Sequence, residues 1–314
     1  MMLIGIIPLS TSEKVVDMQK IRVMTLNLGG GEKNFTGSPE KTQYKTEAIV
    51  QLLEEIKPDV FGVQEISHYI DADGITHSMV DRIHTDCGFQ HAFYGETLSM
   101  KRHMQVKKDL MVNGLFNDWW DWSKGNAIFS NIAFSRLSDT SKVGVPRNVP
   151  LFQPVNYEGS RDTDPRYVIL TRLKQAPYPF VLNLHLTTLV GERGENAWSE
   201  VVDAARITRS QQISGIISLV QRHVLIPQLP MILMGDFNAT AEEYTLRDML
   251  ERDHGIMPLK PQDNIATHPH AGAVDHIFFF PVKRLVDYTC YVVSTPLSHS
   301  ISDHLPVVAD IIIQ

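Results

Sequence analysis

The chain alternates short apolar runs with longer stretches in which apolar residues recur every three or four positions. Residues 180–184, Phe-Val-Leu-Asn-Leu, are apolar nearly throughout, which is typical of a strand covered on both faces. We expect strands at 21–28, 59–66, 126–134, 166–173, 180–186, 231–237, 274–280, 291–294 and 306–313.

Two segments have helical periodicity. Residues 40–56 carry an apolar face that ends at Lys57-Pro58, and residues 198–220 carry a longer one that begins at Trp198. Strands that are covered on both faces need a second sheet on one side and helices on the other. The pattern therefore predicts a layered α/β sandwich, although it does not predict the order of the strands.

Residues 95–124 fit neither pattern, because they are polar and end in Asn-Asp-Trp-Trp-Asp-Trp at 117–122. One interpretation is an inserted loop that its tryptophans hold against the body of the fold. The other is a substrate-facing lip, since indole rings stack on bases, sugars and lipid interfaces. The sequence favours neither.

The chain has 314 residues, of which 43% are hydrophobic and 21% charged, and it lacks repeats and Pro/Gly/Ser-rich linkers. We therefore expect one domain over residues 18–314. Residues 1–17 are expected to form an N-terminal extension, a candidate for disorder, with Met18 as an alternative start. Their apolar run is too short to span a bilayer and lacks the features of a secretory signal, so we expect a cytoplasmic location.

The formal charge of -7 lowers the odds of a long-DNA substrate, since non-specific duplex binders usually present a net basic face. The one basic cluster is Lys101-Arg102-His103 with Lys107-Lys108, and a solvated loop is favoured there over a phosphate-binding patch. Cys87 and Cys290 have no metal-ligand spacing, and two buried free thiols are favoured over a disulfide.

Polar side chains of the kinds used in catalysis lie at the ends of several predicted strands. Each one alone is more commonly a turn residue, a helix cap or a structural histidine, but together they favour one shared site. They are Asn27, Glu65, His185, Asp236, Asn238, Asp275, Asp303 and His304.

These residues resemble the endonuclease/exonuclease/phosphatase superfamily, which has the deoxyribonuclease I-like fold. The resemblance covers nearly the whole chain from about residue 20, and its most specific parts are Gly-Asp-Phe-Asn at 235–238 and Ser-Asp-His at 302–304. It implies a four-layer α/β/β/α sandwich of two mixed, largely antiparallel sheets flanked by helices. It also implies metal-dependent phosphoester hydrolysis with Mg2+, or with Mn2+ as an alternative.

The resemblance further implies which residues hold the metal and which contact the phosphate. Glu65 would be the main Mg2+ ligand, with Asn27 and Asp303 nearby or in a second metal position, because oxygen ligands suit this ion. His304 would contact the phosphate or take a proton from the attacking water, and Asp275 would fix the tautomer of its ring.

Three further roles follow from the same resemblance. Asp236 would orient or deprotonate the water, and the choice between Asp236 and His304 as the base stays open. Asn238 would donate its amide to a phosphoryl oxygen in the transition state. His185 would donate a hydrogen bond to the phosphate from the opposite side, or act as a general acid.

Gly29 stands where abasic-site repair members carry an acidic residue, and those members usually lack a histidine at position 185. The chain therefore resembles the two-histidine branch more closely, which includes deoxyribonuclease-like and sphingomyelinase-like enzymes. The candidate phosphate clamps are arginines, because a guanidinium binds phosphate oxygens in pairs, and Arg166 could equally cap a sheet edge. The candidate substrate residues are Arg166, Arg193 and Arg161, with Asn126 on the same rim; His268 and His270 are assigned to a surface loop.

The leading hypothesis is a monomeric Mg2+-dependent phosphoester hydrolase that acts on nucleic acid or on a smaller phosphodiester or phosphomonoester, without stable membrane insertion. A lipid phosphodiesterase of the sphingomyelinase type is the alternative within the same chemistry. A non-catalytic binding module on the same fold is the alternative from another class. The intact set of polar positions disfavours it.

Overall fold

The protein is described by a computed structural model that covers residues 18–29, 39–70, 73–103, 108–116, 120–154, 157–158, 160–194 and 197–314. The expected N-terminal extension at 1–17 lies outside the described residues, as do Lys107 and Trp119.

The first sheet contains seven strands and is antiparallel except for one pair. Its order is β12 (Leu285–Val292), β13 (Val307–Ile313), β1 (Gln19–Asn27), β2 (Val60–Ile70), β5 (Ser123–Ser130) and β4 (His91–Ser99), and the short β3 (Thr76–Ser78) also pairs with β2. Only β1 and β2 run parallel. These two central strands therefore end at the same edge of the sheet.

The second sheet repeats this arrangement with six strands. Its order is β10 (Met257–Pro258), β11 (Asp275–Phe280), β9 (Met231–Asp236), β8 (Phe180–His185), β7 (Arg166–Arg172) and β6 (Arg147–Phe152). Again only the central pair, β8 and β9, is parallel.

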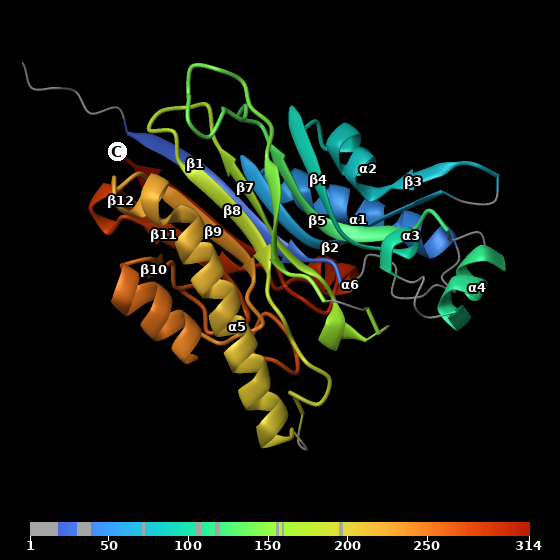
Figure 1. Cartoon of the computed structure of the whole chain (residues 1–314). Coiled ribbons are helices and arrows are strands. Elements are labelled where there is room, and N and C mark those ends of the chain that lie inside the picture. Colours follow the sequence, from blue (N-terminus) through green and yellow to red (C-terminus); the bar gives the residue numbers. More distant parts are fainter. Residues whose placement is uncertain are drawn as a thin grey trace, which may run out of the picture.

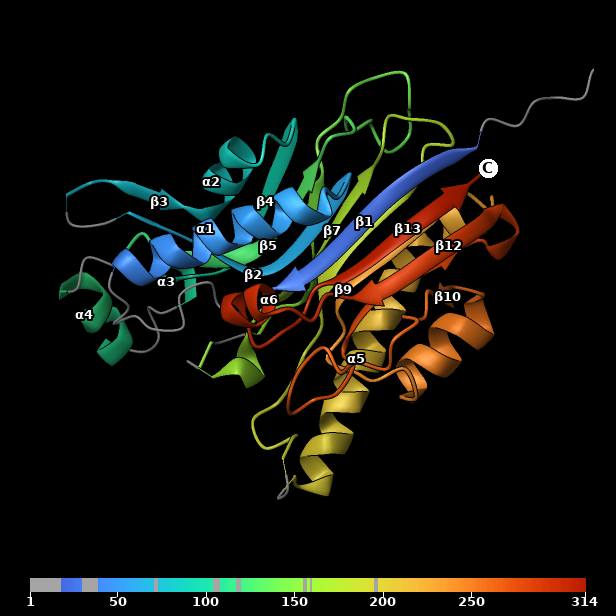
Figure 2. The ribbon, with the colours of Figure 1, turned by 180° about the vertical axis from the view of Figure 1, so that it is seen from behind.

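Helices cover the outer face of each sheet. On the first sheet these are α1 (Pro39–Ile56), α2 (Met79–Asp86) and α6 (Pro296–Ile301), and on the second they are α5 (Ser199–Val220) and the π-helical segments Gln221–Leu225 and Thr245–Arg252. Figure 1 shows α5 in front of the second sheet, and Figure 2, from behind, shows α1 in front of the first. The predicted four-layer α/β/β/α sandwich is confirmed.

The face between the sheets is filled by branched apolar side chains, among them Val23, Val181, Ile232 and Ile277, each at most 1% exposed. The outer faces of the same strands pack against helices. Burial on both sides explains why these strands are apolar nearly throughout.

The segment 95–124 agrees with the first interpretation in the packing of its tryptophans, but much of it is a strand and two helices and not a loop. Residues 95–99 complete β4, and the helices α3 (Met100–His103) and α4 (Lys108–Phe116) follow. Trp120 and Trp122 are half-buried against a small cluster of Leu98, Met100 and Tyr157. These two indoles hold the insertion to the body of the fold, and they do not line the cavity described below.

Candidate active site

Glu65 has an unusual backbone that places its carboxylate at the edge of the first sheet. The register of β2 against β5 shifts between Val63 and Ile66, and Glu65 has a φ of 54°, in the left-handed region that non-glycine residues rarely adopt. An irregularity of this kind bends a strand and re-aims its side chains. It directs Glu65 into a cavity between the two sheets.

A buried polar link joins this irregular stretch to the second sheet. The side-chain amide of Asn183 in β8 donates to the carbonyls of Val63 (3.0 Å) and Ala127 (2.9 Å), and its oxygen accepts from Gln64 (2.5 Å). Gly62 makes room for this amide, because a Cβ there would lie 2.9 Å from Asn183 Oδ1. The link ties the two residues before Glu65, and the neighbouring strand β5, to the opposite sheet.

The ends of the two parallel strand pairs meet at one edge of the sandwich. Asn27 ends β1, and its Nδ2 donates to Asp236 Oδ2 at the end of β9 (2.9 Å) and lies 3.4 Å from Glu65 Oε1. His185 ends β8 and is paired in register with Asp236. Both sheets therefore contribute polar side chains to one site.

Asp236 and Asn238 are held in place by the sharp turn that follows β9. The Gly235 backbone passes so close to β8 that a Cβ would lie 2.0 Å from the Leu184 carbonyl oxygen. Asp236 Oδ1 accepts from the backbone N–H of Asn238 (2.8 Å), while Asn238 Nδ2 donates to the Leu186 carbonyl (2.9 Å) and lies 3.3 Å from Asp236 Oδ2. The Asn238 amide thus has protein acceptors for its hydrogens.

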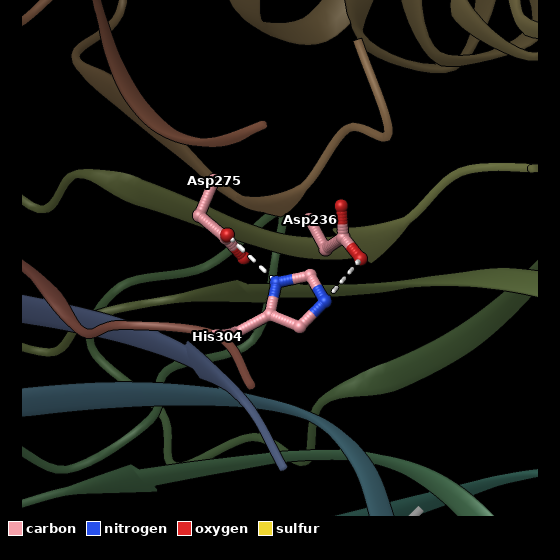
Figure 3. Close-up of side chains that lie close together, drawn as sticks. All are labelled: Asp236, Asp275 and His304. Carbon is pink, nitrogen blue, oxygen red and sulfur yellow. Dashed lines mark hydrogen bonds and ion pairs between the residues drawn. The ribbon is translucent and has the colours of Figure 1, made fainter. Parts of the chain in front are cut away.

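His304 lies between two buried carboxylates (Figure 3). Its Nδ1 is 2.8 Å from Asp275 Oδ2 and its Nε2 is 3.9 Å from Asp236 Oδ2. Burial alone would lower the pKa of His304, but Asp275 and Asp236 outweigh it and raise the pKa to about 10. The three residues offer ligand atoms within 4.8 Å of one another, yet Nδ1 is already bonded to Asp275. The arrangement is that of an oriented imidazole.

His185 has a different environment, although its Nε2 also lies 3.4 Å from Asp236 Oδ2. Arg166 Nη1 lies 2.9 Å from His185 Nε2, so this ring nitrogen accepts and the proton belongs on Nδ1. Burial and the Arg166 cation lower the pKa of His185 to about 3. The two histidines of the site are therefore held in opposite charge states.

Lys124 is a site residue that the sequence analysis missed. Its Nζ lies 3.5 Å from Glu65 Oε2 and 3.1 Å from Asp164 Oδ2. Burial raises the pKa of Glu65, but the cations around it, Lys124 foremost, outweigh burial and hold that pKa well below its usual range. No pattern marks Lys124 or Asp164, because their role depends on the pairing of β2 with β5.

One cavity of about 250 Å³ collects these groups. Asp275 lies behind His304, and Asn126 lines a smaller adjoining pocket with Glu65, Lys124 and Arg166. All the other predicted site residues line the main cavity: Asn27, Glu65, His185, Asp236, Asn238, Asp303 and His304, with Arg161, Arg166 and Arg193.

The assignment of His268 to a surface loop is wrong. The residue is half-buried, lines the cavity and stacks edge-on against His304 with 4.8 Å between ring centroids. Only His270 is exposed, as expected. The error arose because the loop folds back through a contact between His268 and Gly272, which brings residues far from the strand end to the site.

The basic cluster is solvated, as favoured, in its described members. Lys101 pairs with Asp121, and Arg102 Nη1 lies 3.5 Å from Glu96. None of these residues lines the cavity. Cys290 is buried and Cys87 is half-buried, and both are free thiols.

The donors at the site fit a hard divalent cation only in part. Glu65 and Asp303 present carboxylate oxygens to the cavity, and a Glu65 carboxyl with a depressed pKa stays ionised, as Mg2+ or Mn2+ requires. Asn27 instead turns its Nδ2 toward Glu65, while its Oδ1 accepts from the N–H of Gly29 (2.8 Å). The carboxylates fit the ion as they stand, whereas Asn27 would have to rotate its amide.

A sequence profile of the Endonuclease/Exonuclease/phosphatase family matches residues 24–304. The chain belongs to this family. Family members are generally metal-dependent phosphoester hydrolases that act on phosphoester or nucleic-acid substrates. No helix within the described ranges is both long and apolar enough to cross a bilayer.

Solved structures of this family and fold agree with the match. An endonuclease/exonuclease/phosphatase from Beutenbergia cavernae DSM 12333 is 19% identical with a TM-score of 0.64, over 94% of this chain and 72% of that one. The human Nocturnin catalytic domain is 17% identical with a TM-score of 0.58, over 95% and 97%. TDP2 from C. elegans is 13% identical with a TM-score of 0.58, over 93% and 75%. No curated protein gives a significant sequence match.

Proposed function

We propose that the protein is a Mg2+-dependent phosphoester hydrolase in which water attacks a phosphate bound between the two sheets. The observation that carries the proposal is the Asp275–His304–Asp236 arrangement beside the cavity that Glu65 also lines. An imidazole oriented by a carboxylate is the usual device for proton transfer at a reacting centre.

Glu65 and Asp303 would hold the metal. When bound, Mg2+ neutralises charge on a phosphate oxygen and on the leaving oxygen. Lys124 holds the Glu65 carboxylate at 3.5 Å, and the Asn183–Gln64 link fixes the backbone around it. The ligand is therefore positioned before the metal arrives.

Asp236 would receive the proton of the attacking water, and His304, whose raised pKa keeps its ring charged, would donate from Nε2 to a phosphate oxygen. Asp236 is fixed by the Asn27 amide and by the Asn238 N–H, so one of its oxygens can orient the water. Asp275 engages Nδ1 of His304, so Nε2 is the ring nitrogen left for the substrate. In this account Asn238 positions Asp236.

Arg166 and Arg193 would bind the phosphate oxygens. Arg166 is only 5% exposed, has no carboxylate within 4 Å in the described part of the chain, and leaves its Nε without a partner. A buried cation without an anionic partner is costly, and a phosphate would supply the opposite charge. Arg193 is held by the Asn238 carbonyl and Oδ1 (3.0 and 2.7 Å), which leaves it facing the same cavity.

The test compares hydrolysis of bis-p-nitrophenyl phosphate, p-nitrophenyl phosphate, single-stranded DNA and sphingomyelin vesicles in Mg2+, Mn2+ or EDTA. We expect a metal-dependent rate for the wild type on at least one ester, and a rate at least about 100-fold lower for His304→Ala. Equal rates for the two proteins on every ester and metal would favour the binding-module alternative. A preference for vesicles over soluble esters would support the lipid alternative.

A further inference from the structure

His268 lies on the cavity wall beside the groups assigned to catalysis, without a role in the mechanism above. Its side chain is 15% exposed, and its Nε2 lies 3.9 Å from Asp303 Oδ2. That separation is too long for a hydrogen bond, and no hydrogen-bond acceptor of Nε2 is found among the described residues.

The ring of His268 is fixed by its own loop. Its Nδ1 accepts from the backbone N–H groups of His270 and Ala271, both at 3.1 Å. A nitrogen that accepts two hydrogen bonds cannot carry a proton, so the hydrogen of the neutral ring is on Nε2. The loop therefore presents one N–H donor to the cavity in a fixed direction.

The loop itself is anchored to the rest of the site. Thr267 Oγ1 accepts from the backbone N–H groups of Val274 and Asp275 (3.0 and 3.1 Å), and the Thr267 carbonyl accepts from Leu305 (2.7 Å). The same residue thus fixes the position of His268 relative to both Asp275 and the Asp303–His304 segment.

We propose that His268 is a substrate-contacting residue that donates its Nε2–H to a non-bridging oxygen of the phosphate. This inference rests on the proposed function, because it assumes that a phosphate lies next to His304. A preorganised donor that has no protein acceptor and lies beside the oriented imidazole is suited to an oxygen on which charge develops.

Two substitutions separate this role from a structural one. Asn places an oxygen at the position of Nδ1 and so keeps the acceptor for the loop, but it lacks the distal N–H. Gln places an amide N–H at the position of Nε2 but cannot accept from the loop. A structural role predicts that His268→Gln is the more damaging change, whereas a substrate contact predicts that His268→Asn is.

We expect His268→Asn to lower kcat/KM on the best ester of the panel about 10- to 100-fold, with His268→Gln at least five-fold more active than His268→Asn. His268→Phe keeps an aromatic ring against His304 and should be as impaired as His268→Asn. His270→Asn, in the same loop but exposed, is the matched control and should retain wild-type kinetics. Wild-type rates for His268→Asn or His268→Phe, or equal losses for Asn and Gln, would overturn the inference.

A measurement without turnover keeps this inference separate from the proposed function. In ¹⁵N-histidine NMR spectra, the His268 ring should be the Nε2–H tautomer, and its Nε2 signal should shift when inorganic phosphate and Mg2+ are added. An Nδ1–H tautomer or an unmoved signal would overturn the inference even in an active enzyme. If the signal shifts in a protein that is inactive on every ester, the phosphate contact of His268 is supported and only the proposed hydrolase activity is contradicted.

Discussion

At the residue scale, the two histidines of the site show how the surroundings of a side chain set its charge. Both rings lie near Asp236, but His304 is bonded to Asp275 whereas His185 contacts the guanidinium of Arg166, and their pKa values move in opposite directions. The sequence predicts that both residues belong to the site. It cannot predict their charges, because these depend on partners that are far away along the chain.

The Asp275 carboxylate is expected to control the charge of His304. Asp275→Asn should lower the pKa of His304 from about 10 and reduce kcat/KM by about 10- to 100-fold, as for other carboxylate–imidazole pairs. Histidine NMR titration and steady-state kinetics check the two effects. A pKa of His304 that is unchanged in the variant would contradict this assignment.

The same pair should make the stability of the metal-free protein depend on pH. The pKa of His304 is raised on folding from 6.5 to about 10, so the folded state favours the charged ring. The contribution of the charged His304 ring to the free energy of unfolding is fully present below about pH 6.5 and is lost as the pH rises toward 10. Denaturant unfolding in EDTA should show this loss in the wild type and a smaller loss in Asp275→Asn.

Arg166 is expected to contribute to activity but not to the stability of the fold. Arg166→Met removes a buried cation that has no carboxylate partner, so the free energy of unfolding should not fall. The same change should lower kcat/KM by about 100-fold, because a phosphate ligand is lost. Thermal unfolding and kinetics measure the two quantities. A loss of stability above about 1 kcal/mol would show that Arg166 is instead a structural cap of the sheet edge.

At the element scale, periodicity predicted the strands that are covered on both faces but not those at the edges. β8 and β9 are buried throughout and mostly apolar, because helices and the other sheet cover them. β4 and β6 were missed because most of their side chains are only partly buried, and β6 contains Pro150. The bulge at Glu65 was not predicted either, since it depends on the pairing of β2 with β5.

The Asn183 link between the sheets should stabilise both the fold and the metal site. Asn183→Leu removes the amide that donates to the buried carbonyls of Val63 and Ala127, which should cost about 2–4 kcal/mol. It should also weaken Mn2+ binding, because Glu65 loses the support of Gln64.

The matched control for this change is Asn148→Leu. Asn148 also joins the two sheets, but through one bond to the Glu96 carbonyl (2.8 Å). We expect a loss of about 1 kcal/mol and unchanged Mn2+ affinity, measured by denaturant unfolding and calorimetric titration. Equal Mn2+ affinities for Asn183→Leu and the wild type would argue against a role of the link in positioning Glu65.

At the scale of the whole molecule, the site is a product of the sandwich and not of either sheet alone. Each sheet contributes one parallel strand pair, and the ends of the two pairs meet across the interface through the bond between Asn27 and Asp236. The motifs near 236 and 304 could be assigned to one site from the sequence, because their residue types point to the same chemistry. Lys124, Asp164 and His268 could not, because only the closed sandwich brings them to the cavity.

The most direct test of this shared site is a crystal structure of the protein with Mn2+ and inorganic phosphate. We expect an anomalous Mn2+ peak about 2.1–2.2 Å from a Glu65 carboxylate oxygen. We also expect phosphate oxygens within about 3 Å of the Arg166 guanidinium and of His304 Nε2. A metal bound away from Glu65, or a phosphate outside the cavity between the sheets, would contradict the shared site.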